Sequence, residues 1–255
     1  SDELRKLEPT IKRDISSILD ETIDHLDRKD NVIPFGIEFL DKPAGGMTRQ
    51  ELTVIGGRPG HGKSTLMINI VSKIIEGGYN VMLFNREMSN TEMMKKLICL
   101  ESQNLEYDKV RRHQLNGEHR IEIDRVSKLI STKYKNLMMY DNIRTLAESM
   151  RESRKHKPDV IIDDYIQLIS MPDTSERRFQ IEKIVQDYKW ICKKENCSAL
   201  LVSQLNRDIE KRYEPRPRLS DYSESGVIEQ TAESALFVWY GYVFNDEENS
   251  PYQSE

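Results

Sequence analysis

GGRPGHGKST, residues 56–65, is the stretch that decides how this chain folds. From Gly57 onward it fits the pattern G-x-x-x-x-G-K-[ST] without a departure, and chance would produce that pattern in roughly one chain in a hundred of this length. Glycines let backbone N–H groups converge on phosphate oxygens, a lysine reaches the β- and γ-phosphates, and a serine hydroxyl can ligate Mg²⁺. The stretch therefore predicts a nucleoside triphosphate site.

The flanking residues supply the structure that such a site requires. Residues 52–55 (LTVI) have the composition of a short buried strand, and an apolar helix follows from Thr65 until Gly77-Gly78 stops it. A strand, a glycine loop and a helix N-terminus in that order form an anion-binding arrangement. We expect ATP with Mg²⁺ to be held by the loop, which comprises Gly57, Arg58, Pro59, Gly60, His61, Gly62, Lys63, Ser64 and Thr65.

Composition limits the function classes. A chain of 255 residues has room for one substantial core and a short appendage. The formal net charge of −5 excludes a protein that coats duplex nucleic acid with its whole surface, so any such contact must come from a local patch. The three cysteines fit no zinc spacing and are expected to be reduced thiols. The longest apolar stretch, 235–244, is too short to span a bilayer, so we expect a cytoplasmic protein without a membrane segment.

Residues 1–30 are predicted to be a separate element, a single amphipathic helix. Its apolar residues recur at spacings of three and four with charges between them, and they are Ile11, Ile15, Ile18, Leu19, Ile23 and Leu26. The pattern fits a helix that packs on its own domain and also one that reaches a neighbouring subunit. Residues 31–50 are expected to form an irregular connection into the first core strand.

From Glu51 onward, predicted strands and helices alternate. The strands are 51–56, 80–85, 137–140, 159–168, 198–203 and 234–240, and the helices are 63–76, 89–101, 118–134, 144–157 and 175–195. Ser89 with Glu92 predicts a capping box at the start of the second helix. Such alternation indicates an α/β domain, 31–245, in which helices cover both faces of a mostly parallel sheet. Residues 246–255 are expected to be a mobile tail.

Polar residues follow three of the predicted strands. Glu87 follows the strand at 80–85, the pair Asp163-Asp164 lies in the strand at 159–168, and Gln204 follows the strand at 198–203. Ligands in open α/β sheets bind beyond the carboxyl ends of the strands. Together with Lys63, these residues supply a carboxylate base, an acid for the magnesium shell and an amide that can sense the γ-phosphate.

The chain resembles the RecA-like motor domain of DnaB-type replicative helicases over nearly all of its length. The resemblance is carried by GGRPGHGKST (56–65), LFNREMS (83–89), VIIDDYIQL (160–168), SQLNR (203–207) and SDYSESGVIEQTAE (220–233). It implies a RecA-like P-loop NTPase core in a homo-hexamer. It also implies that ATP hydrolysis drives 5′ to 3′ translocation on single-stranded DNA, with unwinding of the duplex, in a bacterial cell or a phage-infected host.

Specific roles follow from the resemblance. Glu87 matches the catalytic carboxylate that polarises the attacking water, and Gln204 matches the residue that couples the γ-phosphate to DNA-contacting loops. Asp164 matches the acid that acts with Ser64 on Mg²⁺. Asp163 stands where the family more often has an aliphatic residue, so either aspartate can be the one that serves the metal. The helix at 10–28 matches the linker helix that docks on the next protomer.

The DNA contacts are expected in the segment after Gln204. Residues 206–219 contain five basic and three acidic side chains, a composition that also suits a solvated loop. The resemblance places this segment and Gly226 among the loops of the central channel. Ser223 stands where the family often has a basic residue. The predicted DNA-binding residues are Arg207, Arg216, Arg218, Glu224 and Gly226.

The resemblance also suggests that the sequence is a fragment. DnaB-type helicases carry an N-terminal collar domain that contacts primase and a C-terminal hairpin whose basic residues reach a neighbour's ATP site, and neither is recognisable here. Primase and a helicase loader would therefore bind through parts absent from this chain. Because such basic fingers contribute about 10³–10⁵ in rate, this chain alone is expected to hydrolyse ATP poorly.

Two other functions stay open at this point. A recombinase-like filament ATPase can use the same core, although the linker helix and the ESGVIEQ segment (224–230) favour a ring. A nucleotide-gated scaffold or loader that does not hydrolyse ATP is the alternative outside enzymes. The intact set Lys63, Ser64, Glu87, Asp164 and Gln204 argues against it.

Overall fold

A six-stranded parallel sheet forms the centre of the molecule in a computed structural model that describes residues 14–27, 31–171, 176–222 and 226–241. The strand order is β5-β4-β6-β7-β3-β8, and every neighbouring pair runs parallel. The strands are β3 (Leu52–Gly57), β4 (Val81–Asn85), β5 (Leu137–Tyr140), β6 (Val160–Asp164), β7 (Ser198–Gln204) and β8 (Ser234–Val238). The predicted α/β architecture is confirmed.

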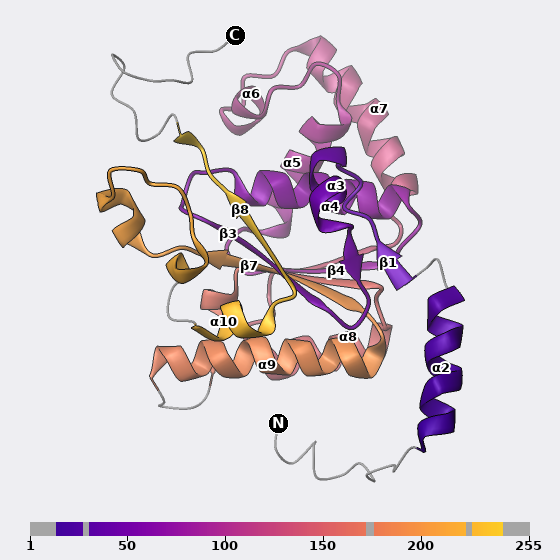
Figure 1. Cartoon of the computed structure of the whole chain (residues 1–255). Coiled ribbons are helices and arrows are strands. Elements are labelled where there is room, and N and C mark those ends of the chain that lie inside the picture. The colour runs from indigo at the N-terminus through magenta and orange to yellow at the C-terminus, as the bar shows by residue number, and fades with distance from the viewer. Residues whose placement is uncertain (1–13, 28–30, 172–175, 223–225, 242–255) are drawn as a thin grey trace.

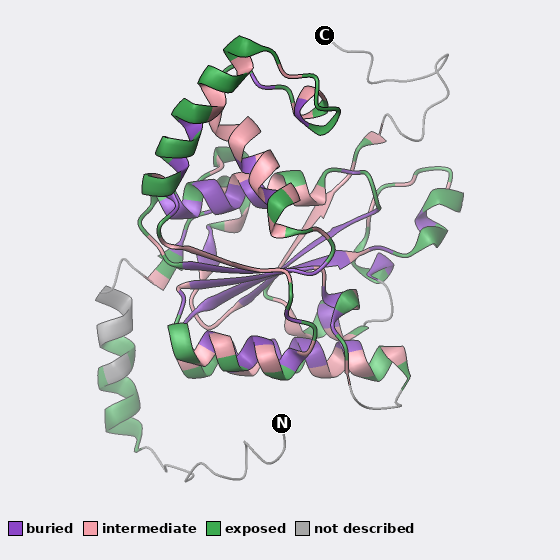
Figure 2. Ribbon diagram, turned by 180° about the vertical axis from the view of Figure 1, so that it is seen from behind, coloured by how far each residue is buried: buried purple, intermediate pink, exposed green. Residues whose placement is uncertain are grey.

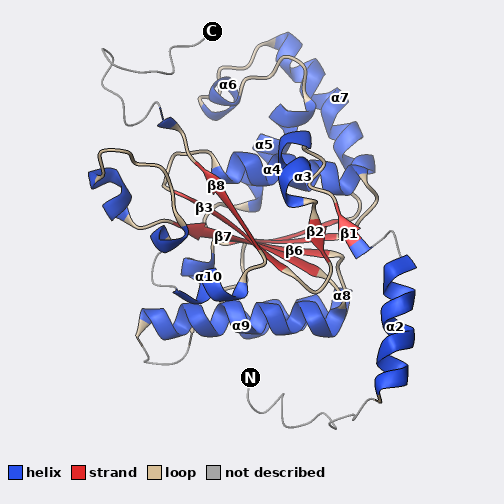
Figure 3. Cartoon of the chain, in the orientation of Figure 1, coloured by secondary structure: helices blue, strands red, loops and turns tan. Residues whose placement is uncertain are grey.

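Helices cover both faces of this sheet, because parallel strands need long crossover connections (Figure 1, Figure 3). One face carries α8 (Leu146–His156), α9 (Arg177–Glu195) and α10 (Gly226–Thr231). The other face carries α3 (Glu38–Ala44), α4 (Lys63–Glu76), α5 (Asn90–Glu101) and α7 (Gly117–Lys133), with the short α6 (Tyr107–Arg111) beyond them.

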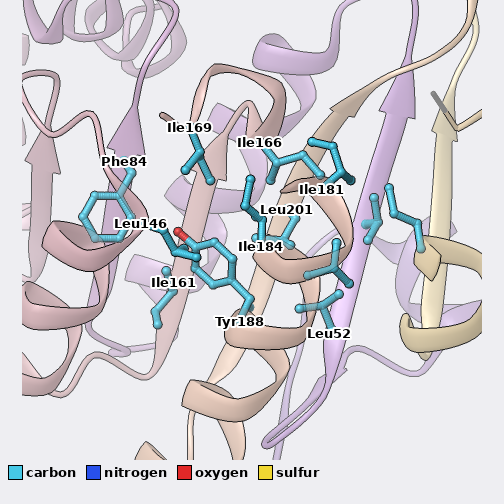
Figure 4. Packing of buried hydrophobic residues seen from close by; sticks show 14 of the residues in the cluster. Leu52, Phe84, Leu146, Ile161, Ile166, Ile169, Ile181, Ile184, Tyr188 and Leu201 are labelled. Carbon is cyan, nitrogen blue, oxygen red and sulfur yellow. The ribbon is translucent and has the colours of Figure 1, made fainter. Parts of the chain in front are cut away.

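Alternation along the strands divides the buried residues into two cores. In β6, Val160 and Ile162 belong to the core under α4, whereas Ile161 belongs to the core under α9. Figure 4 shows Ile161 and Leu201 of the sheet beside Ile184 and Tyr188 of α9. The central strands are buried on both faces (Figure 2), so their sequences are nearly continuous apolar runs.

Two parts of the prediction were wrong. The strand predicted at 159–168 ends at Asp164, and a 3₁₀ helix, η2 (Ile166–Leu168), follows it. Residues 31–50 are not irregular, since β1 (Val32–Ile33) pairs antiparallel with β2 (Met47–Thr48) and α3 lies between them. Both strands are two residues long, too short to give a period-two pattern. The Asp41 carboxylate closes the intervening turn by accepting from the N–H groups of Phe35 (2.7 Å) and Ile37 (3.1 Å).

The helix predicted in the first thirty residues is present as α2 (Ile15–Asp27). It extends beside the body of the molecule (Figure 1). Four of its large apolar side chains are exposed to solvent. The exposed fractions are 84% for Ile15, 47% for Ile18, 56% for Leu19 and 49% for Ile23. Residues 1–13 and the predicted tail at 246–255 lie outside the described residues. Among the described helices, none is long and apolar enough to cross a membrane.

Gly56 in β3 offers a test of how closely the segment after β7 packs on the sheet. A Cβ at Gly56 would lie 2.7 Å from a ring carbon of Tyr222 and 2.8 Å from a methyl carbon of Leu205. We expect Gly56→Ala to lower the free energy of unfolding by about 1–3 kcal/mol, measured by urea titration, because both neighbours must shift. Gly117→Ala is the control, since no atom lies within 4 Å of its Cβ position. Equal stability of the two variants would contradict this packing.

Candidate functional site

The glycine loop between β3 and α4 has the conformation of an anion site. Gly60 and Gly62 have φ values of +80° and +92°, in the left-handed region that favours glycine. Gly62 is the N-cap of α4, and the first turn of that helix carries no acidic residue. The free N–H groups and the positive end of the helix dipole at this point attract a phosphate.

Lys63 lies across this loop. Its ammonium donates to the backbone carbonyl of Arg58 at 3.0 Å, and its Cγ lies 2.8 Å from where a Cβ on Gly57 would be. Burial lowers the pKa of Lys63, while the charges of Asp164 and Glu87 act in the opposite direction. Gly57 therefore leaves space for the lysine, whose charge lies among two acids and the loop backbone.

Asp164 closes the site from the end of β6. Its Oδ2 accepts from the Ser64 hydroxyl at 3.0 Å, while its Oδ1 is buried without a hydrogen-bond partner among the described residues. Burial raises the pKa of Asp164 to about 6, although the Ser64 hydrogen bond opposes that effect. A carboxylate beside a hydroxyl, with one oxygen unsatisfied, is the kind of hard-oxygen donor set that Mg²⁺ takes. The residues present fit the metal.

Asn85 is a second unsatisfied group that the sequence analysis did not assign. It ends β4 directly beside Asp164 in the strand register, and both polar atoms of its buried amide lack a partner in the described part of the chain. Most buried polar side chains are hydrogen-bonded, so two unsatisfied groups side by side mark a functional position. The signal in the sequence was a polar residue at the last position of an apolar strand.

Asp163 lies on the other face of the sheet from Asp164. Its carboxylate binds the Arg86 guanidinium through two hydrogen bonds of 2.6 Å and also accepts from the Tyr188 hydroxyl. It is buried under α9, where the sheet separates it from the glycine loop. The suggestion that Asp163 can serve the metal therefore disagrees with the geometry, because successive side chains of a strand point to opposite faces.

Glu87 and Gln204 flank the site at the neighbouring strand ends. Glu87 is exposed, and its charge acts on Lys63 and Asp164. Gln204 is half-buried at the end of β7, where its backbone N–H donates to Oε1 of Gln167 at 3.2 Å. The amide of Gln167 in turn donates to the Ser203 hydroxyl at 2.9 Å. The sequence analysis missed Gln167, although it lies in the quoted segment 160–168.

Two further loop residues connect the site to its neighbours. Arg58 forms an ion pair with Glu210 at 2.6 Å and donates to the carbonyl of Leu205 at 2.8 Å, both in the segment after β7. Nδ1 of His61 accepts from the N–H of Tyr240 at 3.1 Å, beyond β8. Burial, followed by the charge of Lys63, lowers the pKa of His61. The glycine loop thus contacts the segments that follow β7 and β8, the two strands that flank β3 in the sheet.

The residues predicted to contact DNA lie in the segment after β7. Arg207 begins η3 (Arg207–Lys211), Arg216 and Arg218 are exposed, and Gly226 opens α10. Glu224 lies outside the described residues. Two other basic residues of the segment bind acids, namely Lys211 with Asp208 and Arg212 with Asp221. Arg207, Arg216 and Arg218 are exposed cations of the same segment.

Comparison with known proteins decides the family. The profile of the family described as DnaB-like helicase C terminal domain matches residues 32–255. The chain belongs to this family. Two replicative DNA helicases named DnaB are similar to it: that of Buchnera aphidicola (subspecies Acyrthosiphon pisum), 30% identical over 92% of this chain, and that of Helicobacter pylori, 31% identical over 91%. The chain covers 54% and 50% of their lengths, so it spans about half of these DnaB proteins.

Solved structures show the same fold. A solved ATPase domain superposes with a TM-score of 0.83 at 25% identity, covering 94% of this chain and 88% of that one. A DnaB-like replicative helicase, solved in a study of its interactions with primase, superposes with a TM-score of 0.76 at 25% identity. That match covers 97% of this chain and 63% of the other. The RecA-like P-loop NTPase core predicted from the sequence is confirmed.

Asp164 makes stability depend on pH in the absence of nucleotide and Mg²⁺. Its folded-state pKa of about 6 lies above the ordinary value of 3.8, so the buried charge destabilises the fold above pH 6, and this cost disappears as the pH falls toward 3.8. We expect Asp164→Asn to raise the free energy of unfolding by about 1–3 kcal/mol at pH 7.5, with a smaller gain at pH 4.5, measured by urea titration.

The neighbouring aspartate gives the matched control. Asp163→Asn removes the partner of the buried Arg86 and should lower stability at pH 7.5. A loss of stability for Asp164→Asn at pH 7.5, or the same sign for both variants, would contradict the division of the two aspartates between the two faces.

Proposed function

We propose that this chain is the ATP-hydrolysing motor domain of a hexameric replicative helicase that moves 5′ to 3′ on single-stranded DNA and unwinds duplex. The observation that carries the proposal is the meeting of Lys63, Ser64, Asp164 and Glu87 at the ends of three strands in a chain of the DnaB-like family. A scaffold that only binds nucleotide would not need a second carboxylate beside this lysine.

Different residues of the chain bind the phosphates, hold the metal and activate the water. The loop amides from Gly57 to Thr65 and the Lys63 ammonium bind the phosphates, while Ser64 and Asp164 hold Mg²⁺. The metal, when bound, neutralises charge on the transferred phosphoryl group. Glu87 orients the attacking water and takes its proton, a role that its exposed position at the end of β4 permits.

The segment after β7 is proposed to carry DNA and to respond to nucleotide. Arg207, Arg216, Arg218 and the backbone N–H of Gly226 would contact phosphates irrespective of sequence, as translocation requires. Six copies around a channel would concentrate positive charge although the whole chain is acidic. Gln204 begins this segment, and Arg58 binds it from the glycine loop through Glu210. A change in the bound phosphates can therefore be transmitted to the DNA-contacting segment through these few residues.

The exposed apolar face of α2 is proposed to dock on the next protomer. Four large apolar side chains of this helix face solvent in the single chain, which fits a surface that an oligomer covers. Primase and a helicase loader are proposed partners of the assembled helicase, the former because a related helicase has been studied with primase. Since the named relatives are bacterial, the proposed location is the cytoplasm of a bacterial cell or phage-infected host.

Glu87→Gln tests the catalytic assignment. The amide cannot accept a proton, so we expect the DNA-stimulated rate of ATP hydrolysis to fall about 10²–10⁴-fold while ATP binding is retained. Phosphate release in the presence of single-stranded DNA and binding of a fluorescent ATP analogue are the measurements. Glu118→Gln, an exposed acid at the start of α7, is the control. The motor mechanism is wrong if Glu87→Gln hydrolyses ATP at the unchanged rate.

Replacing the apolar face of α2 tests the assembly. We expect Ile18→Ser with Ile23→Ser to shift the population from rings to monomers, because two large buried contacts would be lost at each of six interfaces. Mass photometry with an ATP analogue and single-stranded DNA measures the particle size. Asp20→Ser, an exposed polar residue of the same helix, should leave the rings intact. Rings that survive the double substitution would place the interface elsewhere.

A further inference from the structure

An ion pair lies directly behind the catalytic strand ends, on the face of the sheet away from the glycine loop. Arg86 and Asp163 have side chains that are 1% and 0% exposed. Their two hydrogen bonds of 2.6 Å join β4 to β6 across the sheet, at the positions next to Glu87 and Asp164. Neither residue reaches the phosphate site.

The pair makes further hydrogen bonds with its surroundings. The Arg86 guanidinium also donates to the carbonyl of Ile143 at 3.1 Å and to the Ser149 hydroxyl of α8 at 2.7 Å. The Tyr188 hydroxyl of α9 donates to Asp163, and in Figure 4 the Tyr188 side chain lies among Leu146, Ile161 and Ile184. The pair therefore connects two strand ends to α8 and α9, two of the three helices that cover this face.

Arg86 stays charged inside the core. Burial acts to lower the pKa of Arg86, but the hydrogen bonds and charge of Asp163 outweigh it and raise the pKa well above its ordinary value. Burial and the charge of Asp163 also raise the pKa of Tyr188, so its hydroxyl remains a donor. Replacing a buried ion pair by packed apolar residues is often neutral or stabilising. Stability alone therefore does not explain why the chain has this ion pair. Directional hydrogen bonds that fix two strand ends relative to each other do explain it.

Glu87 depends on this anchoring more than other site residues do. In the described part of the chain its carboxylate takes part in no hydrogen bond or ion pair, so its place is set by the backbone that carries it. The preceding residue, Arg86, is held by four side-chain hydrogen bonds, and its own N–H donates to the carbonyl of Asp164 at 2.8 Å. Fixing Arg86 fixes the start of the Glu87 backbone relative to Asp164.

We propose, on the basis of the proposed function, that Arg86 and Asp163 are positioning residues for ATP hydrolysis: as one hydrogen-bonded unit they hold the ends of β4 and β6 so that Glu87 and Asp164 stand in register at the phosphate site. They touch neither nucleotide nor metal. Their contribution is to the rate of the chemical step and not to the affinity for ATP, because ATP is bound chiefly by the glycine loop on the opposite face.

The experiment measures the rate of the chemical step and the affinity for ATP separately in this chain. Single-turnover hydrolysis with the protein in excess over ATP, in the presence of single-stranded DNA, gives the rate constant of the bound state. Binding of a fluorescent ATP analogue with Mg²⁺ gives the dissociation constant. The variants are Arg86→Lys, Asp163→Asn and the double variant Arg86→Leu/Asp163→Leu, which buries no unpaired charge. Each rate is expressed per folded molecule, from an unfolding curve of the same sample.

We expect each single variant to slow hydrolysis about 10–100-fold, because a displacement of about 1 Å at reacting groups costs up to that much. The dissociation constant for ATP should change less than about threefold. The double variant should fold and be slowed at least about tenfold, but no more than the slower single variant, because residues that act as one unit are not additive. If a single variant does not fold, the double variant decides.

Lys133→Met is the matched control for breaking a half-buried charge network elsewhere. Lys133 binds Glu76 at 2.7 Å and the Ser72 hydroxyl at 3.0 Å near the far end of α4, about 20 Å along that helix from the glycine loop. Its loss should lower stability and leave the hydrolysis rate of the folded chain unchanged. A purely structural role for Arg86 and Asp163 would make their variants behave like this control.

Three results would overturn the inference: wild-type hydrolysis by the folded double variant, a slowing matched by an equal loss of ATP affinity, or losses in the single variants that multiply in the double. The proposed function fails separately, since it requires that the unaltered chain hydrolyse ATP and that Glu87→Gln slow this hydrolysis about 10²–10⁴-fold. If that pair of results holds while the Arg86 and Asp163 variants hydrolyse normally, only the positioning role is wrong.

Discussion

The alternation of side chains along a parallel strand is the constraint on which the functional site depends. Asp163 and Asp164 are neighbours in the chain, yet β6 sends one to the core under α9 and the other to the glycine loop. The same rule places Asn85 beside Asp164 and Phe84 with the opposite core. One strand thus presents Asp164 to the glycine loop on one face and Asp163 to Arg86 on the other, and a register shift of one residue would exchange the two.

The two faces differ in how well their polar groups are satisfied. Behind the sheet, the carboxylate of Asp163 accepts from both Arg86 and Tyr188. In front of it, Asp164 and Asn85 keep buried atoms without partners among the residues that the structure describes, and burial disfavours the charge of Asp164. Unsatisfied groups destabilise an empty site and become favourable when a ligand pairs with them. The two faces of one strand end thus differ: the hydrogen bonds are made behind the sheet, and groups that a ligand can pair lie in front of it.

Local patterns in the sequence were enough to predict much of this arrangement. The limits of α4 and β5 match the predicted ones, because a glycine loop with a lysine defines the first and a short apolar run the second. Lys63, Ser64 and Asp164 were predicted to share one site and do so. The parallel sheet brings them together without further information, since its strands all end at one edge.

Such local patterns could not predict contacts between residues that are far apart in the sequence. The partners Arg86 and Asp163 are 77 residues apart, and Arg58 and Glu210 are 152 apart. A lone charge at a strand end is compatible with solvent, metal or a buried partner, and only the fold decides among them. For the same reason Asp163 was an open candidate for the metal, and Gln167 was not recognised as the residue that holds the end of β7.

The position of Trp239, immediately after β8, affects the tryptophan fluorescence of the molecule. The guanidinium of Arg216 lies 5.9 Å from the centre of its indole ring, so a cation of the exposed segment after β7 contacts one of only two tryptophans in the chain. The other, Trp190 on α9, lies under Arg154 and Lys194 on the face of the sheet that α8, α9 and α10 cover. We therefore expect indole emission to report displacement of Arg216 from Trp239, with no attached dye.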